Sequence, residues 1–352
     1  MTTPATLFIV ISIFCSICSI SSSDVTVATS GDDASNSASN SHTLVTYTYG
    51  PLKEKYFPEF HSPLRNFSFQ FLNGIAEQRI NVSIAQHYKA NASGVGSAVW
   101  EGSAVLSSFI SRRAYTLFLT TSASPVTPSP QHVVIEIGAG QGLVSIVTTI
   151  ALQKLQQQGS QSNQSGARVH VTDGDESCLV QTQRNLDSNI DNNVSNVVAS
   201  TNVVRWGNLT DLASFGTASW VFAADVVFEN ENENENENDD NDNEKGNKKV
   251  EKENQKMLHA ANHAFAALTK SFDYLIPQDS KGALLLAYKR RRKRESRFFD
   301  MMNDYGFHTS RVKKRFVHYK YRNMFELFCF AKDDTTCQER LGRLVKLVVP
   351  SV

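Results

Sequence analysis

A glycine-rich turn between two apolar runs is the clearest chemical feature of this sequence. The β-branched residues 133–137 are typical of a buried parallel strand. Residues 138–142 read Gly-Ala-Gly-Gln-Gly, and apolar residues at helical spacing follow them. Glycines let the backbone approach a ligand closely, and the N-terminus of a helix presents unpaired N–H groups. Strand, turn and helix in this order predict a nucleotide-type binding site.

The spacing of this turn leaves three interpretations open. A dinucleotide site has G-x-G-x-x-G with the pyrophosphate on the helix. Here the glycines follow G-x-G-x-G, and Glu136 lies two residues before the first of them. An acid at that place suits a ligand with a cationic or donor-rich end better than it suits a pyrophosphate. The pattern E-x-G-x-G-x-G resembles the first motif of the S-adenosylmethionine (SAM) methyltransferases, so SAM is favoured over a dinucleotide or a purely structural turn.

Two further acids follow apolar runs and complete the candidate chemistry. Residues 168–173 are predicted to form a second strand that ends in Asp173, where an acid of a doubly wound sheet binds ribose hydroxyls. Residues 220–228 are predicted to form a central strand that contains Asp225. A buried unpaired carboxylate is costly, so we expect Asp225 at the C-terminal edge of the sheet, where ligands bind.

The elements that must position these residues alternate between strands and helices, which predicts an α/β sheet with helices on both faces. Additional strands are expected at residues 202–208, 283–288, 308–312 and 324–331, with helices between them. Ahead of the sheet, residues 67–71 and 80–84 alternate between apolar and polar side chains. This alternation predicts an N-terminal β-hairpin.

The composition is that of an ordinary globular protein, with 41% hydrophobic and 20% charged residues and a formal net charge of zero. No global attraction to nucleic acid or anionic membrane is implied, and we expect no nucleic-acid partner. Outside the N-terminal apolar run the cysteines are Cys178, Cys329 and Cys337. They lack metal-ligand spacing and a paired framework, so the sequence predicts neither a metal site nor a disulfide-stapled domain.

Composition also divides the chain into segments. Residues 1–42 combine an apolar stretch at 6–20 with a Ser/Asn-rich linker. The apolar stretch has the length of a signal-peptide core but lacks a basic start, so a signal, a membrane anchor and a non-functional segment all stay open. Residues 43–92 are expected to form the β extension, and 93–332 the main domain. Residues 229–249 are expected to be a disordered Asn/acid insertion, and 333–352 a tail.

The order of these motifs resembles the seven-stranded SAM-dependent protein-lysine methyltransferases. This family includes enzymes that act on Hsp70-type chaperones, elongation factors and calmodulin. The resemblance covers roughly residues 67–332 and is specific in the order and spacing of its motifs. They read VWEGSAVL (99–106), IEIGAGQGL (135–143), VTDGDE (171–176), VRWGN (204–208), AADVVF (223–228) and LLAYKRR (285–291).

The resemblance implies a Rossmann-like, seven-stranded fold that binds SAM, and it implies roles for individual residues. Asp225 opens a D-x-x-[YF] motif where the substrate nitrogen arrives; the family usually has Tyr at its end, whereas this chain has Phe228. Asp225 and Phe228 are therefore the candidate catalytic residues. The candidate cofactor-binding residues are Trp100, Glu136, Gly138, Ala139, Gly140, Asp173, Trp206 and Ala224.

The expected activity is methyl transfer from SAM to a lysine amine of a protein such as a chaperone or an elongation factor. A small-molecule or histidine N-methyltransferase on the same fold, and a non-catalytic SAM-binding module, are the alternatives. A dinucleotide oxidoreductase would require the spacing G-x-G-x-x-G and a catalytic Tyr/Lys or His pair, and this sequence has neither. We expect a monomer with a cytoplasmic catalytic domain, because a secreted enzyme would lack SAM; contact of the N-terminus with a membrane stays open.

Overall fold

The computed structural model describes residues 62–72, 77–86, 95–119, 132–158, 166–191, 196–227, 262–291 and 295–347. All of them belong to one unit of the chain, Leu44–Val352. The predictions for the N-terminal segment 1–42 and for the acidic insertion 229–249 lie outside the described residues, and so does Phe228.

A mixed sheet forms the centre of the fold, and its strand order is β10-β8-β9-β7-β6-β3-β4-β5. The five strands β7, β6, β3, β4 and β5 are parallel, whereas β9 is antiparallel to both β7 and β8. The strands are β3 (His132–Ile137), β4 (Ala167–Asp173), β5 (Val197–Val203), β6 (Trp220–Ala224), β7 (Ala283–Tyr288), β8 (His308–Val312), β9 (Glu326–Ala331) and β10 (Val345–Leu347). The predicted α/β class is confirmed, and β10 is added to the seven expected strands.

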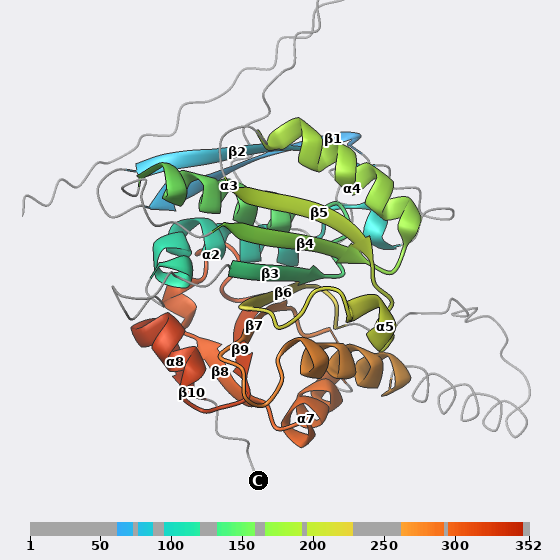
Figure 1. The fold of residues 1–352 in the computed structure, drawn as a ribbon. Coiled ribbons are helices and arrows are strands. Elements are labelled where there is room, and N and C mark those ends of the chain that lie inside the picture. The colour runs from blue at the N-terminus through green and yellow to red at the C-terminus, as the bar shows by residue number, and fades with distance from the viewer. Residues whose placement is uncertain are drawn as a thin grey trace, which may run out of the picture. The chain divides into compact units, whose positions relative to one another are not determined.

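Helices cover both faces of the sheet, as Figure 1 shows. Their bounds are α2 (Glu101–Phe118), α3 (Leu143–Gln158), α4 (Glu176–Asn189), α5 (Leu209–Leu212), α7 (Ser296–Asp304) and α8 (Thr336–Leu341), with a further helix at residues 262–275. Short 3-10 turns lie at η1 (Val95–Ser97), η3 (Lys314–Phe316) and η4 (Gly342–Leu344). In the described part of the chain, no helix is long and apolar enough to cross a membrane.

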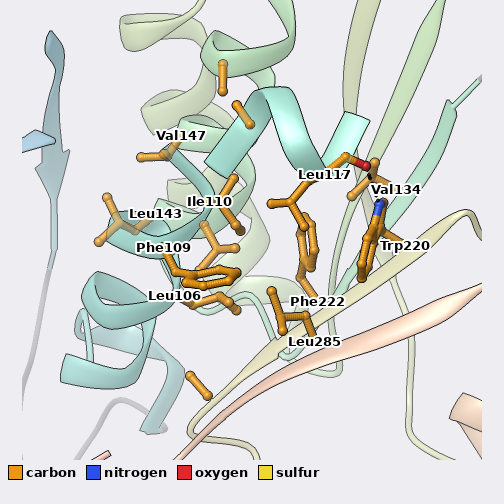
Figure 2. Packing of buried hydrophobic residues seen from close by; sticks show 14 of the residues in the cluster. Leu106, Phe109, Ile110, Leu117, Val134, Leu143, Val147, Trp220, Phe222 and Leu285 are labelled. Carbon is orange, nitrogen blue, oxygen red and sulfur yellow. Dashed lines mark hydrogen bonds between the residues drawn. The ribbon is translucent and has the colours of Figure 1, made fainter. Parts of the chain in front are cut away.

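Successive side chains of the strands point to opposite faces of the sheet and contribute to two separate hydrophobic cores. Val134, Phe222 and Leu285 point to the core that α2 and α3 cover, whereas their neighbours Ile135 and Val221 belong to the core on the other face. Figure 2 shows α2 and α3 packed on the first face, where the indole of Trp220 donates a hydrogen bond to the carbonyl of Leu117, 3.0 Å away. Because strand side chains alternate between faces, a sheet covered on both sides reads as continuous apolar runs.

The predicted N-terminal hairpin is confirmed as β1 (Leu64–Leu72) and β2 (Glu77–Ala85), an antiparallel pair. Its alternate apolar side chains join the first core. Two asparagines of α4, one helical turn apart, hold the outer edge of β2: Asn185 bonds the N–H and C=O of Ala85, and Asn189 those of Ser83. The side-chain amides therefore serve the edge as a neighbouring strand would.

Two sequence-based expectations are wrong in position. The third strand was expected at residues 202–208, but β5 runs over Val197–Val203 in register with β4. Gly207 has a left-handed backbone, and the side chain of Asn208 accepts the N–H of Thr210 at the start of α5. This capping chemistry ends the extended segment before Trp206.

The C-terminal tail is the other correction, because α8, η4 and β10 are folded against the domain within residues 333–352. Cys337 at the start of α8 forms a disulfide with Cys329 of β9. The sequence predicted no such pair, since only three cysteines lie outside the N-terminal run and their spacing names no framework. The link ties the last helix to the sheet at buried positions.

Candidate active site

The glycine turn lies between β3 and α3, at the C-terminal edge of the parallel strands. Gly138, Gly140 and Gly142 all have positive φ, at 68°, 51° and 80°. A Cβ on Gly138 would lie 2.7 Å from Cγ1 of Val226 and 3.6 Å from Cζ2 of Trp206. Only glycine fits this conformation and this close approach. The turn therefore packs directly against the segments that follow β5 and β6.

Asp173, the predicted ribose ligand, ends β4 beside this turn. Its Oδ2 accepts the N–H of Gly140 at 2.9 Å, and its Oδ1 accepts the N–H of Asp175 at 3.0 Å. Burial raises the pKa of this carboxyl, and the two N–H donors oppose that rise. Each oxygen of a carboxylate has two acceptor positions. Asp173 is therefore fixed against the turn and still has acceptor positions for hydroxyl donors.

Glu136 lies inside the fold. Its carboxylate is 2% exposed and accepts both the N–H of Ser145, at 2.9 Å, and the hydroxyl of that residue. Burial raises the pKa of Glu136 to about 8, although both bonds to Ser145 lower it. The structure thus shows Glu136 as an internal partner of the first turn of α3; its predicted role in cofactor binding stays a prediction.

The 3-10 turn η1, for which the sequence predicts no role, contacts the glycine turn. The carbonyl of Gly96 in η1 accepts Nε2 of Gln141 at 2.8 Å. A Cβ on Gly96 would lie 3.6 Å from Cα of Gly140 and 3.7 Å from Oδ2 of Asp173. Trp100 follows η1 as the N-cap of α2 and is half-buried. The segment that precedes Trp100 thus contacts the turn through Gly96, and the cofactor role of Trp100 stays a prediction.

Asp225 follows β6 directly and is the only non-glycine residue with positive φ in the described part of the chain, at 57°. The prediction that it lies at the C-terminal edge of the strand is confirmed. Its Oδ2 accepts the N–H of Gly102 at 2.6 Å, and its Oδ1 pairs with Nη2 of Arg291 at 2.5 Å. Burial raises the pKa of Asp225, whereas Arg291 and the Gly102 N–H lower it. Strained backbones of this kind concentrate at functional sites.

Arg291 is the residue that sequence reasoning missed here. It lies in the basic run 289–294, which the sequence presents as one charged surface. In the structure Lys289 pairs with Glu101 at 3.8 Å, Arg291 pairs with Asp225, and the N–H of Arg291 donates to the buried Glu295 at 2.9 Å. A pairing of residues 66 apart in sequence leaves no local signal.

The remaining predicted site residues lie around the same edge. Trp206 lies in the turn after β5, near Gly138, and Ala224 is the last residue of β6. Ala139 donates its N–H to the carbonyl of Thr172 at 2.9 Å, which ties the turn to β4. No group of His, Cys, Asp and Glu suited to a metal ion occurs among the residues that the structure describes.

The residues at this edge fit a SAM-sized cofactor. Three left-handed glycines leave no side chain over the turn, and Asp173 offers acceptors beside it. Oε1 of Gln141, within the turn, is buried and accepts no hydrogen bond from the described residues. A buried acceptor without a partner is costly, so a donor on a bound ligand would stabilise it.

Comparison with known proteins agrees with this geometry. Residues 77–236 match the sequence model of a family described as lysine methyltransferase. This part of the chain is therefore similar to that family. No protein with a curated description matches the chain.

Solved structures similar to this chain include several methyltransferases. One is the DszA carbon methyltransferase, at 11% identity and a TM-score of 0.36, covering 61% of this chain and 51% of that one. Another is a SAM-dependent methyltransferase from Aquifex aeolicus, at 11% identity and a TM-score of 0.31, covering 65% and 97%. The chain thus spans about half the length of the first of these. At such scores the likeness says nothing about the substrate.

Proposed function

We propose that this protein transfers a methyl group from SAM to the side-chain amine of a lysine in a protein substrate. The observation that carries the proposal is the presence of two carboxylates at the same edge of the sheet. Asp173 adjoins the glycine turn, and Asp225 lies two strands away, across β3, held by Arg291. The lysine methyltransferase match over residues 77–236 supports the same assignment.

The cofactor side of the site consists of the turn and its neighbours. Bound SAM supplies a methyl group carried on a positively charged sulfur. Gly138, Ala139 and Gly140 would hold its amino-acid end, Asp173 its ribose and Trp206 its adenine. Backbone and side-chain groups that are already fixed bind with little loss of conformational entropy. No metal ion is required for this binding.

The acceptor side is built on Asp225. Both of its oxygens accept a hydrogen bond, from Arg291 and Gly102, and each keeps an acceptor position that an incoming amine N–H can use. Its side chain is 5% exposed, so little water competes for that position. Lysine must arrive uncharged, and desolvation favours the neutral amine. Positioning of the amine in line with the methyl then supplies much of the rate.

Phe228 favours a second candidate, a SAM-binding module without catalysis. It stands where the family usually has Tyr, and it lies outside the described residues. A histidine or small-molecule N-methyltransferase would use the same cofactor side. These functions differ in whether a methyl group is transferred and in which group accepts it, and the experiment below separates them.

The test is to incubate the full chain with tritium-labelled SAM and a cell extract depleted of small molecules, and then to hydrolyse the labelled protein. Methyl-lysine in the hydrolysate is the expected product, and Asp225→Asn should abolish it. Glu339→Gln, which removes an exposed charge of α8, should leave the labelling unchanged. Methyl-histidine, or label only in added small molecules, would contradict the lysine assignment.

A further inference from the structure

A basic surface without a counter-ion among the described residues is formed by residues of α2, η3 and η4. We define the arginine cluster as Arg112, Arg113, Arg315 and Arg343. Arg113 and Arg315 both lie over the ring of Phe316, with Cζ 5.2 and 4.9 Å from the ring centre. Nη2 of Arg112 donates to the carbonyl of the same Phe316 at 3.4 Å. Three guanidinium groups, from α2 and η3, therefore contact this one aromatic residue.

Arg343 belongs to the cluster through its charge and its backbone. The positive charge of Arg343 lowers the pKa of Arg113, after burial as the larger cause, and that of Arg113 lowers the pKa of Arg112. Nζ of Lys313 donates to the carbonyl of Arg343 at 2.9 Å. The cations thus lie close enough to repel one another.

No carboxylate pairs with these four arginines within the described part of the chain. The segment 311–325 contains no Asp and no Glu, and it carries six Lys or Arg residues. His318 in this segment has its pKa lowered to about 4 by burial and by the charges of Arg112 and Lys320. The cluster therefore repels further positive charge, and the part of the chain that the structure describes supplies no counter-ion for it.

The basic run 289–291 behaves differently, which makes the cluster distinctive. Lys289 and Arg291 are neutralised by Glu101 and Asp225. Arg311, at the start of the segment 311–325, pairs with Glu326 at 2.7 Å, and Lys332 pairs with Asp273 at 2.5 Å. Guanidinium groups suit carboxylates, which they can bind in a bidentate way.

The distance between the arginine cluster and the acceptor side determines how many substrate residues would separate the lysine from a segment bound at the cluster. Arg112 lies on α2 about ten residues beyond Gly102, which bonds Asp225, or about 15 Å at 1.5 Å per residue. An extended peptide spans that distance with about five residues at roughly 3.3 Å each. We propose that the arginine cluster binds an acidic stretch of the protein substrate, four to six residues from the lysine that enters the active site. This inference rests on the proposed function.

The first test measures binding alone, so that it does not depend on methyl transfer. A fluorescein-labelled peptide with one lysine and a block of four glutamates five residues away is titrated with the full chain and followed by fluorescence anisotropy. Arg113→Gln combined with Arg315→Gln should weaken binding at least tenfold. The control combines Arg168→Gln with Arg184→Gln, an equal charge change at exposed positions elsewhere, and should change it less than twofold.

The second test places the acidic block two, five and ten residues from the lysine and measures methylation. The lowest KM is expected at five residues, with kcat nearly unchanged by the cluster variant. Equal affinity of the two double variants would overturn the proposal, and so would tighter binding of a ten-nucleotide single-stranded RNA than of the acidic peptide. If no peptide is methylated, the proposed function fails. The anisotropy result still shows whether the arginine cluster binds an acidic peptide.

Discussion

Glu136 and Asp225 are two buried carboxylates in similar surroundings. Each comes from the C-terminal end of a central parallel strand, and each accepts an N–H from the first turn of a helix. Glu136 bonds Ser145 of α3, and Asp225 bonds Gly102 of α2. The N-terminus of a helix stabilises negative charge in both places.

The two carboxylates differ in whether a cationic side chain lies beside them. Asp225 has Arg291 at 2.5 Å, whereas burial without a cationic partner raises the pKa of Glu136 to about 8. At neutral pH the Glu136 side chain is therefore largely protonated, and Asp225 is the carboxylate with a partner for its charge. Both acids lie at strand ends, so this position does not distinguish Asp225 from Glu136. A fixed charge with spare acceptor positions does.

Among substitutions of the residues that contact these two carboxylates, the largest expected effect comes from Gly102→Ala. Its Cβ would lie 2.3 Å from Oδ2 and 2.7 Å from Cγ of Asp225, so that the carboxylate must move. Misplacement of a catalytic group by about 1 Å costs roughly 100-fold in rate. We expect kcat to fall by about that factor while the Kd for SAM stays within threefold. Alanine favours the helix over glycine, so an unfolding temperature as high as wild type's would confirm a local steric effect.

Arg291→Gln tests the charge of Asp225 directly. Among the groups that face Asp225, Arg291 and Lys289 and the Gly102 N–H lower its pKa against the rise caused by burial. Loss of Arg291 therefore raises the pKa of Asp225, and the acidic limb of the rate–pH profile should move to higher pH. Arg291→Lys should restore part of the shift. A profile that does not move in either variant would contradict a role for the ionised carboxylate.

Glu136→Gln should affect stability rather than activity. Because the folded-state pKa of about 8 lies above the ordinary value of 4.5, the folded protein binds the extra proton between these limits. Stability then falls with rising pH across that window, by at most about 1.4 kcal/mol per pH unit, and levels off above it. The Gln variant should lack this slope in urea unfolding measured from pH 5 to 8, with methyl transfer within threefold of wild type.

Ser145→Ala gives the smallest expected effect. It removes the hydroxyl donor to Glu136 and keeps the backbone donor, which costs about 1 kcal/mol of unfolding free energy. Because α3 has room for a side chain at this position, no counterpart of the Gly102 clash arises. A loss of methyl transfer beyond about threefold in this variant would mean that Glu136 acts on the reaction after all.

The sequence predicts the parts of this fold and site that local patterns encode. Alternation in residues 67–71 and 80–84 predicts the hairpin, and the glycine spacing predicts the turn before α3. The cost of burying a bare carboxylate places Asp225 at the strand end. Each of these inferences needs only neighbours in the chain.

Long-range pairs are what the sequence does not reveal. Arg291 resembles the other cations of its run until the structure brings it to Asp225, and Gly96 has no motif that announces its contact with Gln141. The disulfide between Cys329 and Cys337 escapes prediction because three cysteines allow more than one pairing. In the folded C-terminal segment, β10 is held by pairing with β8, which only the sheet supplies.

Calorimetric titration with SAM tests the account most directly, because it separates the two sides of the site. Wild-type protein should bind SAM, Asp173→Asn should lose that binding, and Asp225→Asn should keep it while losing methyl transfer. Folded wild-type protein that binds no SAM, or an Asp173→Asn variant that binds it as well as wild type does, would contradict the assignment of Asp173 and the glycine turn to the cofactor.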